Sequence, residues 1–321
     1  MDRGRCDVVT DHGPVLAVST PVLSPDPART VCVGDWGALR PRTGEPPLLT
    51  ALLPRRSAIV RSTASARSEG QVLATNVDTA AVVEPLTGPV APARVERLLA
   101  LAWESGATPV VVLTKADRHP APGRAAAETA AAAPGADVVA VSAATGDGLD
   151  ALTALLRGTA VLLGPSGAGK STLVNALLGA DVLATGEVRD RDGKGRHTTV
   201  RRELLPLGDG RVLIDTPGLR GVGLWDAAEG LHRAFPEIGE LAEECRFHDC
   251  SHTSEPGCAV LAAVDGGILP QRRLDSYRTL LRENEWTAAR SDARLRAEIR
   301  RRHREGSRSL RQFYRLRGRK E

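Results

Sequence analysis

The spacing of apolar residues changes near residue 70, and this change divides the sequence into an all-β part and an α/β part. Up to about residue 65, short apolar runs alternate with turns that contain glycine and proline, and Asp11-His12-Gly13 predicts a hairpin turn. The runs lie at 5–9, 14–18, 31–33, 51–53 and 58–60. Several strands at such short spacing predict a small β-barrel or sandwich.

Beyond a polar stretch at 62–70 that is typical of a linker, apolar strands alternate with amphipathic helices. Strands are predicted at 72–76, 80–84, 108–113, 137–141, 160–163 and 212–214, and helices at 94–104, 123–133, 148–156, 259–264 and 271–284. Such alternation indicates a parallel sheet covered by helices. We therefore expect three domains: a β-barrel at 1–65, an α/β domain at 66–224 and a helical domain at 225–321.

The segment after the strand at 160–163 fits the pattern G-x-x-x-x-G-K-[ST], which binds phosphate groups. Its glycines allow backbone N–H groups to turn toward phosphate oxygens, and the following helix N-terminus adds its positive dipole. Lys170 is expected to reach the β- and γ-phosphates, and the Ser171 hydroxyl is a candidate Mg²⁺ ligand. The nucleotide-binding residues predicted here are Gly164, Pro165, Ser166, Gly167, Ala168, Gly169, Lys170, Ser171 and Thr172.

A second motif indicates which base the nucleotide carries. Thr114-Lys115-Ala116-Asp117 follows the apolar strand at 108–113 and resembles the guanine motif of GTPases. Asp117 would accept hydrogen bonds from guanine N1–H and the exocyclic amine, a donor pair that adenine lacks. Lys115 would pack along the purine, and Ser142-Ala143 would direct a backbone N–H at guanine O6. The rival class, an ABC-type ATPase, needs an LSGGQ-like signature and an Asp-Glu pair after a strand, and the sequence has neither.

Two segments after the phosphate loop complete the predicted nucleotide site. Asp215-Thr216-Pro217-Gly218 follows the strand at 212–214; Asp215 would hold Mg²⁺ through water, and the Gly218 N–H would sense the γ-phosphate. Thr198 or Thr199, after the glycine-rich stretch 186–196, would supply a hydroxyl that senses Mg²⁺. In an ordinary GTPase the base-reading motifs come after these elements, whereas here they come before. The sequence therefore indicates a circularly permuted GTPase.

One catalytic element is missing from this set. Leu219 occupies the position at which Ras-like GTPases have the glutamine that orients the attacking water. His197 is the nearest candidate to replace it, and the alternative is that His197 only packs against the switch segment. We assign catalysis to His197 together with Lys170, Thr198 and Thr199, and we expect slow basal hydrolysis that a partner stimulates.

Three of the five cysteines lie close together with a histidine, in the spacing Cys245-x4-Cys250-x-His252-x5-Cys258. Three thiolates and one imidazole suit a closed, tetrahedral Zn²⁺ site with a structural role. His248 does not fit this pattern and is left out of the predicted ligand set. The alternative is a group of buried cysteines without a metal.

The net charge of +4 is unevenly distributed. Residues 290–321 contain 13 Lys and Arg against 4 Asp and Glu, so that the tail carries +9 and the remainder −5. Such a tail favours an anionic macromolecular partner, although a solvated Arg-rich helix is the alternative. An RNA-facing protein makes an OB-type barrel the natural candidate for the N-terminal strands. The sequence has no long apolar stretch and no secretory signal, so we expect no membrane partner.

Together these motifs resemble the circularly permuted, ribosome-small-subunit-dependent GTPases of the RsgA (YjeQ) family. The resemblance covers nearly the whole chain and includes Val33-Gly34-Asp35-Trp36, Arg55-Arg56-Ser57 and Asn76-Val77-Asp78. It implies an N-terminal OB fold, a permuted GTPase core and a zinc-binding helical domain, with GTP or GDP, Mg²⁺ and one Zn²⁺ bound. It also implies a cytoplasmic, rRNA-binding factor for late maturation of the small (30S) subunit, with hydrolysis stimulated by that subunit. We expect it to act as a monomer.

The sequence departs from the family pattern in two places. Thr114 stands where many members have Asn, which is expected to loosen the base-binding loop. The arm ahead of the first strand is nearly absent, so an rRNA contact by such an arm is not expected here. The missing glutamine also leaves open an alternative function, an RNA-binding scaffold that holds GTP without turnover.

Overall fold

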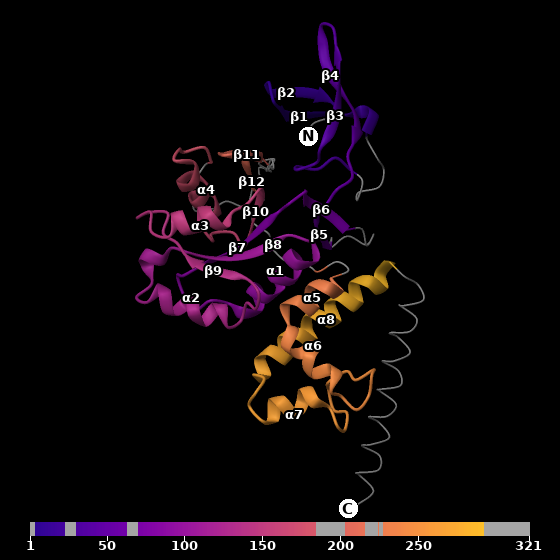
Figure 1. Ribbon diagram of the computed structural model, residues 1–321, viewed down its shortest axis with the longest axis vertical. Helices are drawn as coiled ribbons and strands as arrows, with labels where there is room; N and C mark the ends of the chain where they lie inside the picture. Colours follow the sequence, from indigo (N-terminus) through magenta and orange to yellow (C-terminus); the bar gives the residue numbers. More distant parts are fainter. Residues whose placement is uncertain are drawn as a thin grey trace, which may run out of the picture.

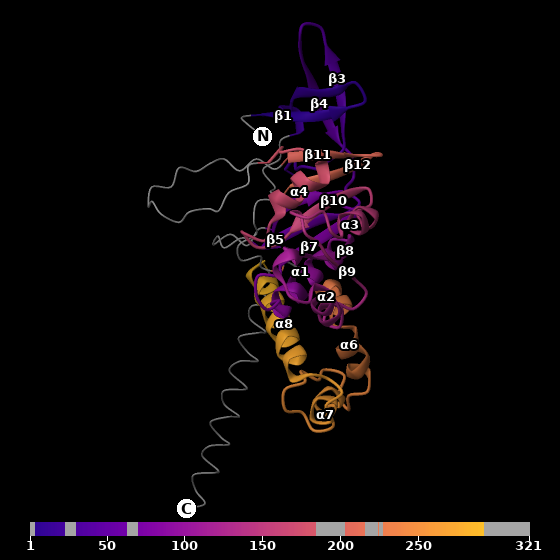
Figure 2. The same cartoon turned by 90° about the vertical axis from the view of Figure 1, so that its left-hand side faces the viewer.

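The computed structural model describes residues 4–22, 30–62, 70–183, 203–215, 224 and 227–291. Its parts follow one another along the longest axis: N-terminal strands, a central sheet with flanking helices, and C-terminal helices (Figure 1). Figure 2 shows the same succession from the side. Among the described helices, none is both long and apolar enough to cross a membrane. The predicted succession of an all-β, an α/β and a helical part is confirmed.

Four N-terminal strands form a sheet in the order β1-β2-β4-β3. They are β1 (Arg5–Thr10), β2 (Gly13–Val18), β3 (Gly37–Arg42) and β4 (Glu45–Leu52), and the short 3-10 helix η1 (Thr20–Val22) follows β2. β1 and β2 pair antiparallel around the predicted turn, and β3 pairs antiparallel with β4. This sheet has its own small core, formed by Cys6, Ala17, Val31 and Leu49.

Two strand assignments from the sequence need correction. Val31–Val33 was expected to be a strand, but residues 30–36 form a turn, which Gly34 permits with φ +92°. The strand at 72–76 was expected in the parallel sheet, but β6 (Gly70–Thr75) pairs antiparallel with β5 (Ala58–Ser62) in a separate ribbon. An apolar run predicts a strand without saying which strand it pairs with, so its partner was misassigned.

The central sheet has six strands in the order β11-β12-β10-β7-β8-β9. They are β7 (Thr79–Pro85), β8 (Thr108–Thr114), β9 (Asp137–Ala140), β10 (Thr159–Leu163), β11 (Glu203–Gly208) and β12 (Arg211–Asp215). All pairings are parallel except that of β11 with β12, which is an antiparallel hairpin at the sheet edge. The inner strands are buried on both faces, which explains their continuous Val, Ala and Leu runs.

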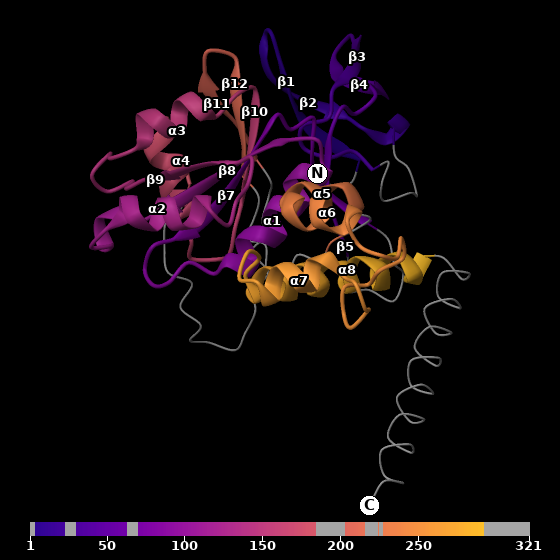
Figure 3. The same ribbon diagram turned by 60° about the horizontal axis from the view of Figure 1, so that its bottom comes forward.

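Helices cover both faces of this sheet (Figure 3). They are α1 (Pro92–Glu104), α2 (Pro122–Ala130), α3 (Leu149–Leu155), α4 (Lys170–Leu178) and, between β8 and α2, the short 3-10 helix η2 (Ala116–Arg118). α1 and α2 pack against the face that carries Val82 and Val111, whereas α3 and α4 pack against the face that carries Val83 and Val112. The carboxyl ends of the parallel strands are thereby left free to form loops at one edge.

The C-terminal part consists of α5 (Ala228–Ala234), α6 (Pro236–Glu243), α7 (Ala259–Asp265) and α8 (Gln271–Ser291). The sequence did not predict α5 and α6, and α8 extends beyond the predicted helix at 271–284. α5 packs very closely on α1, because a Cβ added to Gly230 would lie 2.0 Å from the Ala100 carbonyl oxygen. The apolar residues of these helices join the core on the α1 face of the sheet, so the C-terminal part is not packed independently.

A buried cluster of charges joins α8 to α1. The Glu96 side chain is fully buried; its Oε1 accepts hydrogen bonds from Arg272 (2.7 Å) and Arg273 (2.9 Å), and its Oε2 accepts one from Ser276 (2.5 Å). Arg273 also binds Glu237 and lies 4.3 Å from the centroid of the Phe235 ring. Removing the Glu96 carboxylate would take from buried Arg273 the fully buried one of its two carboxylate partners, and Glu237, which is 36% exposed, would remain.

We therefore expect Glu96→Ala to lower the free energy of unfolding by about 3–5 kcal/mol. Glu128→Ala is the matched control, because Glu128 pairs with Arg124 on the exposed surface of α2. Denaturant titration followed by circular dichroism measures both variants against the wild type. A midpoint for Glu96→Ala that coincides with that of Glu128→Ala would show that this cluster does not stabilise the fold.

Candidate nucleotide site and metal centre

The predicted phosphate loop connects β10 to α4 at the carboxyl edge of the sheet. Gly164 lies against β7, where an added Cβ would come 2.4 Å from the Val83 carbonyl oxygen. Gly167 and Gly169 have φ values of +79° and +87°, a region that side chains rarely adopt. A Cβ added to Gly167 would meet nothing within 4 Å, so this part of the loop faces open space. The segment thus forms the glycine-dependent turn that a phosphate group requires.

Lys170 is the first residue of α4 and points back across this loop. Its side chain is largely buried, and Nζ donates hydrogen bonds of 2.9 Å to the carbonyl oxygens of Gly164 and Pro165. Burial lowers the pKa of Lys170, and the negative charge of Asp215 at the end of β12 opposes this effect. An ammonium beside the loop, with a carboxylate near it, is the arrangement expected around a phosphate–Mg²⁺ group.

The guanine motif is tied directly to the phosphate loop. Lys115 has φ +58°, a strained value, and its Nζ donates a 2.8 Å hydrogen bond to the Gly167 carbonyl oxygen. Thr114 Oγ1 donates a 2.5 Å hydrogen bond to the Ala168 carbonyl oxygen. The Thr114 hydroxyl provides one of these two links. The base-reading and phosphate-binding loops therefore hold each other in place. That threonine loosens the base-binding loop relative to asparagine stays a prediction.

Ser142 has a second role that the sequence did not reveal. Its hydroxyl is buried and donates a 2.7 Å hydrogen bond to Oδ1 of Asp117, the carboxylate predicted to read guanine. The backbone supports the same arrangement, because the Ala116 N–H donates to the Val141 carbonyl oxygen at 3.1 Å. We had expected only a backbone contact to the base from Ser142-Ala143. The sequence contained one signal for this contact: Ser142 carries a hydroxyl just after β9, and β9 is the parallel neighbour of β8, the strand that precedes Asp117.

Several predicted site residues lie outside the described residues. They are His197, Thr198, Thr199 and Gly218, together with Thr216 and Pro217 of the same motif. Ser171 and Thr172 are described and lie in the first turn of α4. The structure therefore brings together the phosphate loop, both base-reading loops and Asp215, while the assignments of His197 and of the two threonines stay predictions.

The four predicted metal ligands converge between α6 and α7. Their ligand atoms lie within 4.8 Å of one another, in the set Cys245, Cys250, His252 and Cys258. Cys245 Sγ lies 3.8 Å from Cys258 Sγ, and His252 Nδ1 lies 3.6 Å and 3.5 Å from these two sulfurs. Tetrahedral Zn²⁺ with ordinary bond lengths separates two sulfurs by about 3.8 Å and a sulfur from a nitrogen by about 3.6 Å.

The chemistry of these side chains also suits a metal. Burial lowers the pKa of His252 and so favours the neutral imidazole, the form that binds a metal. Burial, together with the neighbouring thiols of Cys258 and Cys245, raises the pKa of Cys250 to about 11. Without a cation, the Cys250 thiol therefore resists ionisation. The donor set and its spacing therefore fit one Zn²⁺, with Nδ1 as the nitrogen ligand.

Comparison with known proteins agrees with this geometry. A family model described as RsgA GTPase matches residues 52–225. A Streptomyces avermitilis protein named small ribosomal subunit biogenesis GTPase RsgA is 61% identical over 305 residues, which cover 94% of this chain and 82% of that protein. The crystal structure of YjeQ from Thermotoga maritima has a TM-score of 0.64 at 24% identity, covering 88% of this chain and 95% of that chain. YloQ, described as a circularly permuted GTPase, has a TM-score of 0.60 at 23% identity, covering 88% and 92%.

The fold likeness and the sequence likeness point to the same conclusion. The base-reading motifs on β8 and after β9 precede the phosphate loop after β10, and all three meet at one edge of the sheet. This is the permuted order that was predicted, and the solved structures share its fold. The chain is a GTPase, and it belongs to the RsgA GTPase family.

Proposed function

We propose that this GTPase acts as a maturation factor of the small ribosomal subunit, binds its rRNA, and hydrolyses GTP faster when the subunit is bound. The observation that carries this proposal is the 61% identity, over 94% of the chain, to a relative named as a small-subunit biogenesis GTPase. The basic tail from residue 290 supplies a suitable charge for an RNA partner. A cytoplasmic monomer is part of the same proposal.

The nucleotide would lie across the carboxyl edge of the central sheet. Asp117, oriented by Ser142, would accept the hydrogen bonds of guanine, and Lys115 would lie along the base. Residues 164–172 would surround the phosphates, where the Lys170 ammonium exchanges its carbonyl partners for phosphate oxygens. Ala143 and Gly218 would contribute backbone N–H groups to the base and to the γ-phosphate. Apart from the contact of Gly218, which lies outside the described residues, each of these contacts uses a group of a described loop.

The remaining site residues would act on the γ-phosphate. Ser171, Asp215 and Thr199 are the proposed Mg²⁺ ligands, Asp215 acting through water. Bound Mg²⁺ would neutralise charge on the phosphates. Thr198 is the alternative Mg²⁺-sensing residue, and His197 is proposed to orient the attacking water. Leucine at position 219 cannot do so, which explains why a partner is needed for fast turnover.

We propose that one Zn²⁺ is held by the four ligands between α6 and α7 and replaces a hydrophobic core there.

The proposed domains remain 1–65, 66–224 and 225–321. The first boundary falls between β5 and β6, which are paired, so the ribbon itself connects the N-terminal unit to the GTPase unit.

The guanine assignment leads to a specific prediction. Asp117→Asn is expected to weaken GTP binding about 100-fold, because the charged acceptor for two base N–H groups is lost, and to reduce the preference for GTP over ATP. Asp137→Asn is the control, since Asp137 is the first residue of β9 and lies at the amino ends of the parallel strands, away from the carboxyl ends that form the site. Competition titration with a fluorescent GTP analogue measures both. Equal affinities for the two variants would remove Asp117 from the base site.

Association with the subunit tests the proposed function. The purified protein is sedimented with small or large ribosomal subunits in the presence of GDP or a non-hydrolysable GTP analogue. We expect co-sedimentation with the small subunit, stronger with the GTP analogue than with GDP. Equal binding to the small and the large subunit, or no binding to the small subunit, would overturn the proposal.

A further inference from the structure

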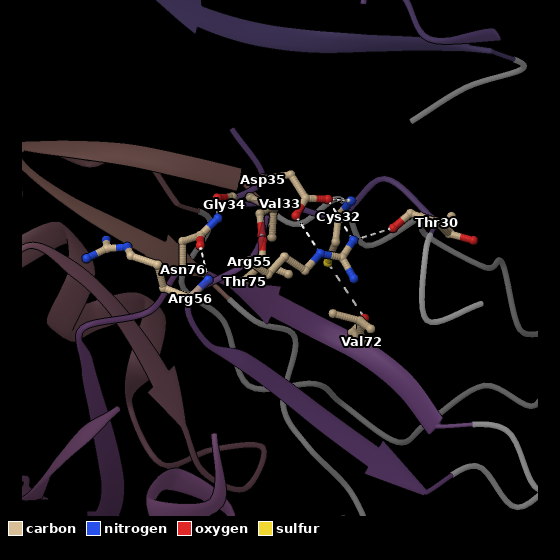
Figure 4. Close-up of polar contacts among 10 residues, drawn as sticks. All are labelled: Thr30, Cys32, Val33, Gly34, Asp35, Arg55, Arg56, Val72, Thr75 and Asn76. Carbon is tan, nitrogen blue, oxygen red and sulfur yellow. Dashed lines mark hydrogen bonds and ion pairs between the residues drawn. The ribbon is translucent and has the colours of Figure 1, made fainter. Parts of the chain in front are cut away.

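Three sequence motifs that the nucleotide site does not use meet at one point of the structure. They are Val33-Gly34-Asp35-Trp36, Arg55-Arg56-Ser57 and Asn76-Val77-Asp78. Figure 4 shows the turn at 30–36, the chain after β4 and the end of β6 joined by polar contacts. The N-terminal sheet has a core separate from that of the central sheet. Val33 of the turn packs against the central core, and directional bonds add to this apolar contact in joining the two parts.

The first part of this junction is a buried ion pair. Arg55 Nε donates to Asp35 Oδ1 at 2.7 Å, and Nη2 donates to Asp35 Oδ2 at 2.8 Å and to the Thr30 carbonyl oxygen at 2.7 Å. The Asp35 side chain is only 2% exposed, and its Oδ2 also accepts the Cys32 N–H. A bidentate pair of this kind fixes both position and orientation. It locks the turn at 30–36 onto the chain that leaves the N-terminal sheet.

The second part attaches that turn to the end of β6. Asn76 Nδ2 donates to the Gly34 carbonyl oxygen at 2.8 Å, and Asn76 Oδ1 accepts the Arg56 N–H at 2.9 Å. The Thr75 N–H donates to the Val33 carbonyl oxygen at 3.1 Å. Asn76 is buried and has φ +52°, a conformation that Asn tolerates better than most residues. Its carboxamide is therefore a cross-link between the two segments.

The third part reaches the strands that carry the nucleotide site. Asp78 binds both backbone groups of Thr159, the first residue of β10, through its own N–H and through Oδ2, each at 2.8 Å. β10 leads directly into the phosphate loop. Gly34 lies close to β12, because a Cβ added to it would lie 3.2 Å from Ile214 Cδ1, and Ile214 precedes Asp215. The junction thus contacts the two strands that position the phosphate loop and Asp215.

We propose that Asp35, Arg55 and Asn76 are positioning residues that couple the N-terminal sheet to β10 and β12, so that a partner held by this sheet accelerates GTP hydrolysis. This inference rests on the proposed stimulation by the small subunit. The sheet offers a contact surface beside the junction, because Trp36 is 63% and Leu53 is 53% exposed. A partner that shifts this surface would, through the junction, also shift β10 and β12.

Asn76→Gly tests the coupling with little risk to folding, because glycine accepts positive φ and only the carboxamide cross-link is lost. Asp209→Gly is the matched control, since Asp209 also has φ +52° but lies in the β11–β12 turn. For Asn76→Gly we expect basal kcat and KM for GTP within about twofold of wild type, and about tenfold less stimulation at saturating small subunit. Stimulation equal to that of Asp209→Gly would overturn the proposal.

A second measurement does not depend on the subunit. If the junction and the nucleotide site are coupled, binding of a non-hydrolysable GTP analogue slows hydrogen exchange of the Thr75 amide in the wild type and in Asp209→Gly, but not in Asn76→Gly. Slowing in all three proteins would contradict the coupling. A wild type that the subunit does not stimulate would refute the proposed function, while this exchange experiment would still decide the role of the junction.

Discussion

Replacing Lys170 with alanine is expected to reduce GTP affinity and kcat/KM about 1,000-fold. The Lys170 ammonium is buried beside the phosphate loop, where it donates hydrogen bonds to the carbonyl oxygens of Gly164 and Pro165. Burial lowers the pKa of Lys170, and the negative charge of Asp215 opposes this effect. In the nucleotide complex it would face the β- and γ-phosphates in a site from which much water is excluded. No other group of the described loop carries a positive charge.

Two further variants make this prediction sharp. Lys170→Met keeps the unbranched stem without the charge and should lose binding as severely as Lys170→Ala. Arg157→Ala removes a cation that precedes β10, at the end of this strand opposite to the phosphate loop, and this variant should bind GTP like the wild type. Isothermal titration with a non-hydrolysable analogue measures affinity, and thermal melting verifies folding. A folded Lys170→Met protein with wild-type affinity would refute the assignment of the phosphate loop.

Loss of the metal should have the second large effect. Cys250→Ser is expected to lose most of its zinc and to destabilise the C-terminal third of the chain, because a structural Zn²⁺ contributes an apparent binding free energy of about 10–16 kcal/mol. Cys258 Sγ also accepts the Leu261 N–H at the start of α7, so the metal centre is continuous with that helix. Chelation of the wild type should therefore reproduce the instability of the variant.

His248→Asn is the matched control for this experiment. His248 lies two residues from Cys250 in the sequence but is not among the four clustered ligands, so this variant should retain one equivalent of zinc. Elemental analysis gives the metal content, and limited proteolysis reports on α6 to α8. Full zinc content in Cys250→Ser, or loss of zinc in His248→Asn, would contradict the ligand set.

The chemistry of the sites could be predicted from the sequence because it depends on residue types at fixed spacing. The turn at 164–170 needs glycine at positive φ followed by Lys170, and the metal centre needs three thiols and an imidazole within a short span. Such requirements leave few alternatives. Long buried strands such as β7 and β8 were equally clear, because a parallel sheet covered on both faces produces continuous apolar runs.

The errors concern pairing and short elements. β11 was missed because its proline and its edge position weaken the alternation of apolar and polar residues. α5 and α6 were missed because they are short, and their burial depends on α1 rather than on a pattern of their own. The second role of Ser142 and the junction around Asp35, Arg55 and Asn76 depend on contacts between distant segments, which one sequence does not specify.

Steady-state hydrolysis of GTP and of ATP, each with and without small ribosomal subunits, tests the central claim most directly. We predict slow turnover of GTP alone, no turnover of ATP, and an increase in the GTP rate of about 100-fold or more when the subunit is present. ATP turnover equal to that of GTP would contradict the base-reading site around Asp117. A GTP rate that the subunit leaves unchanged would contradict the proposed role in small-subunit maturation.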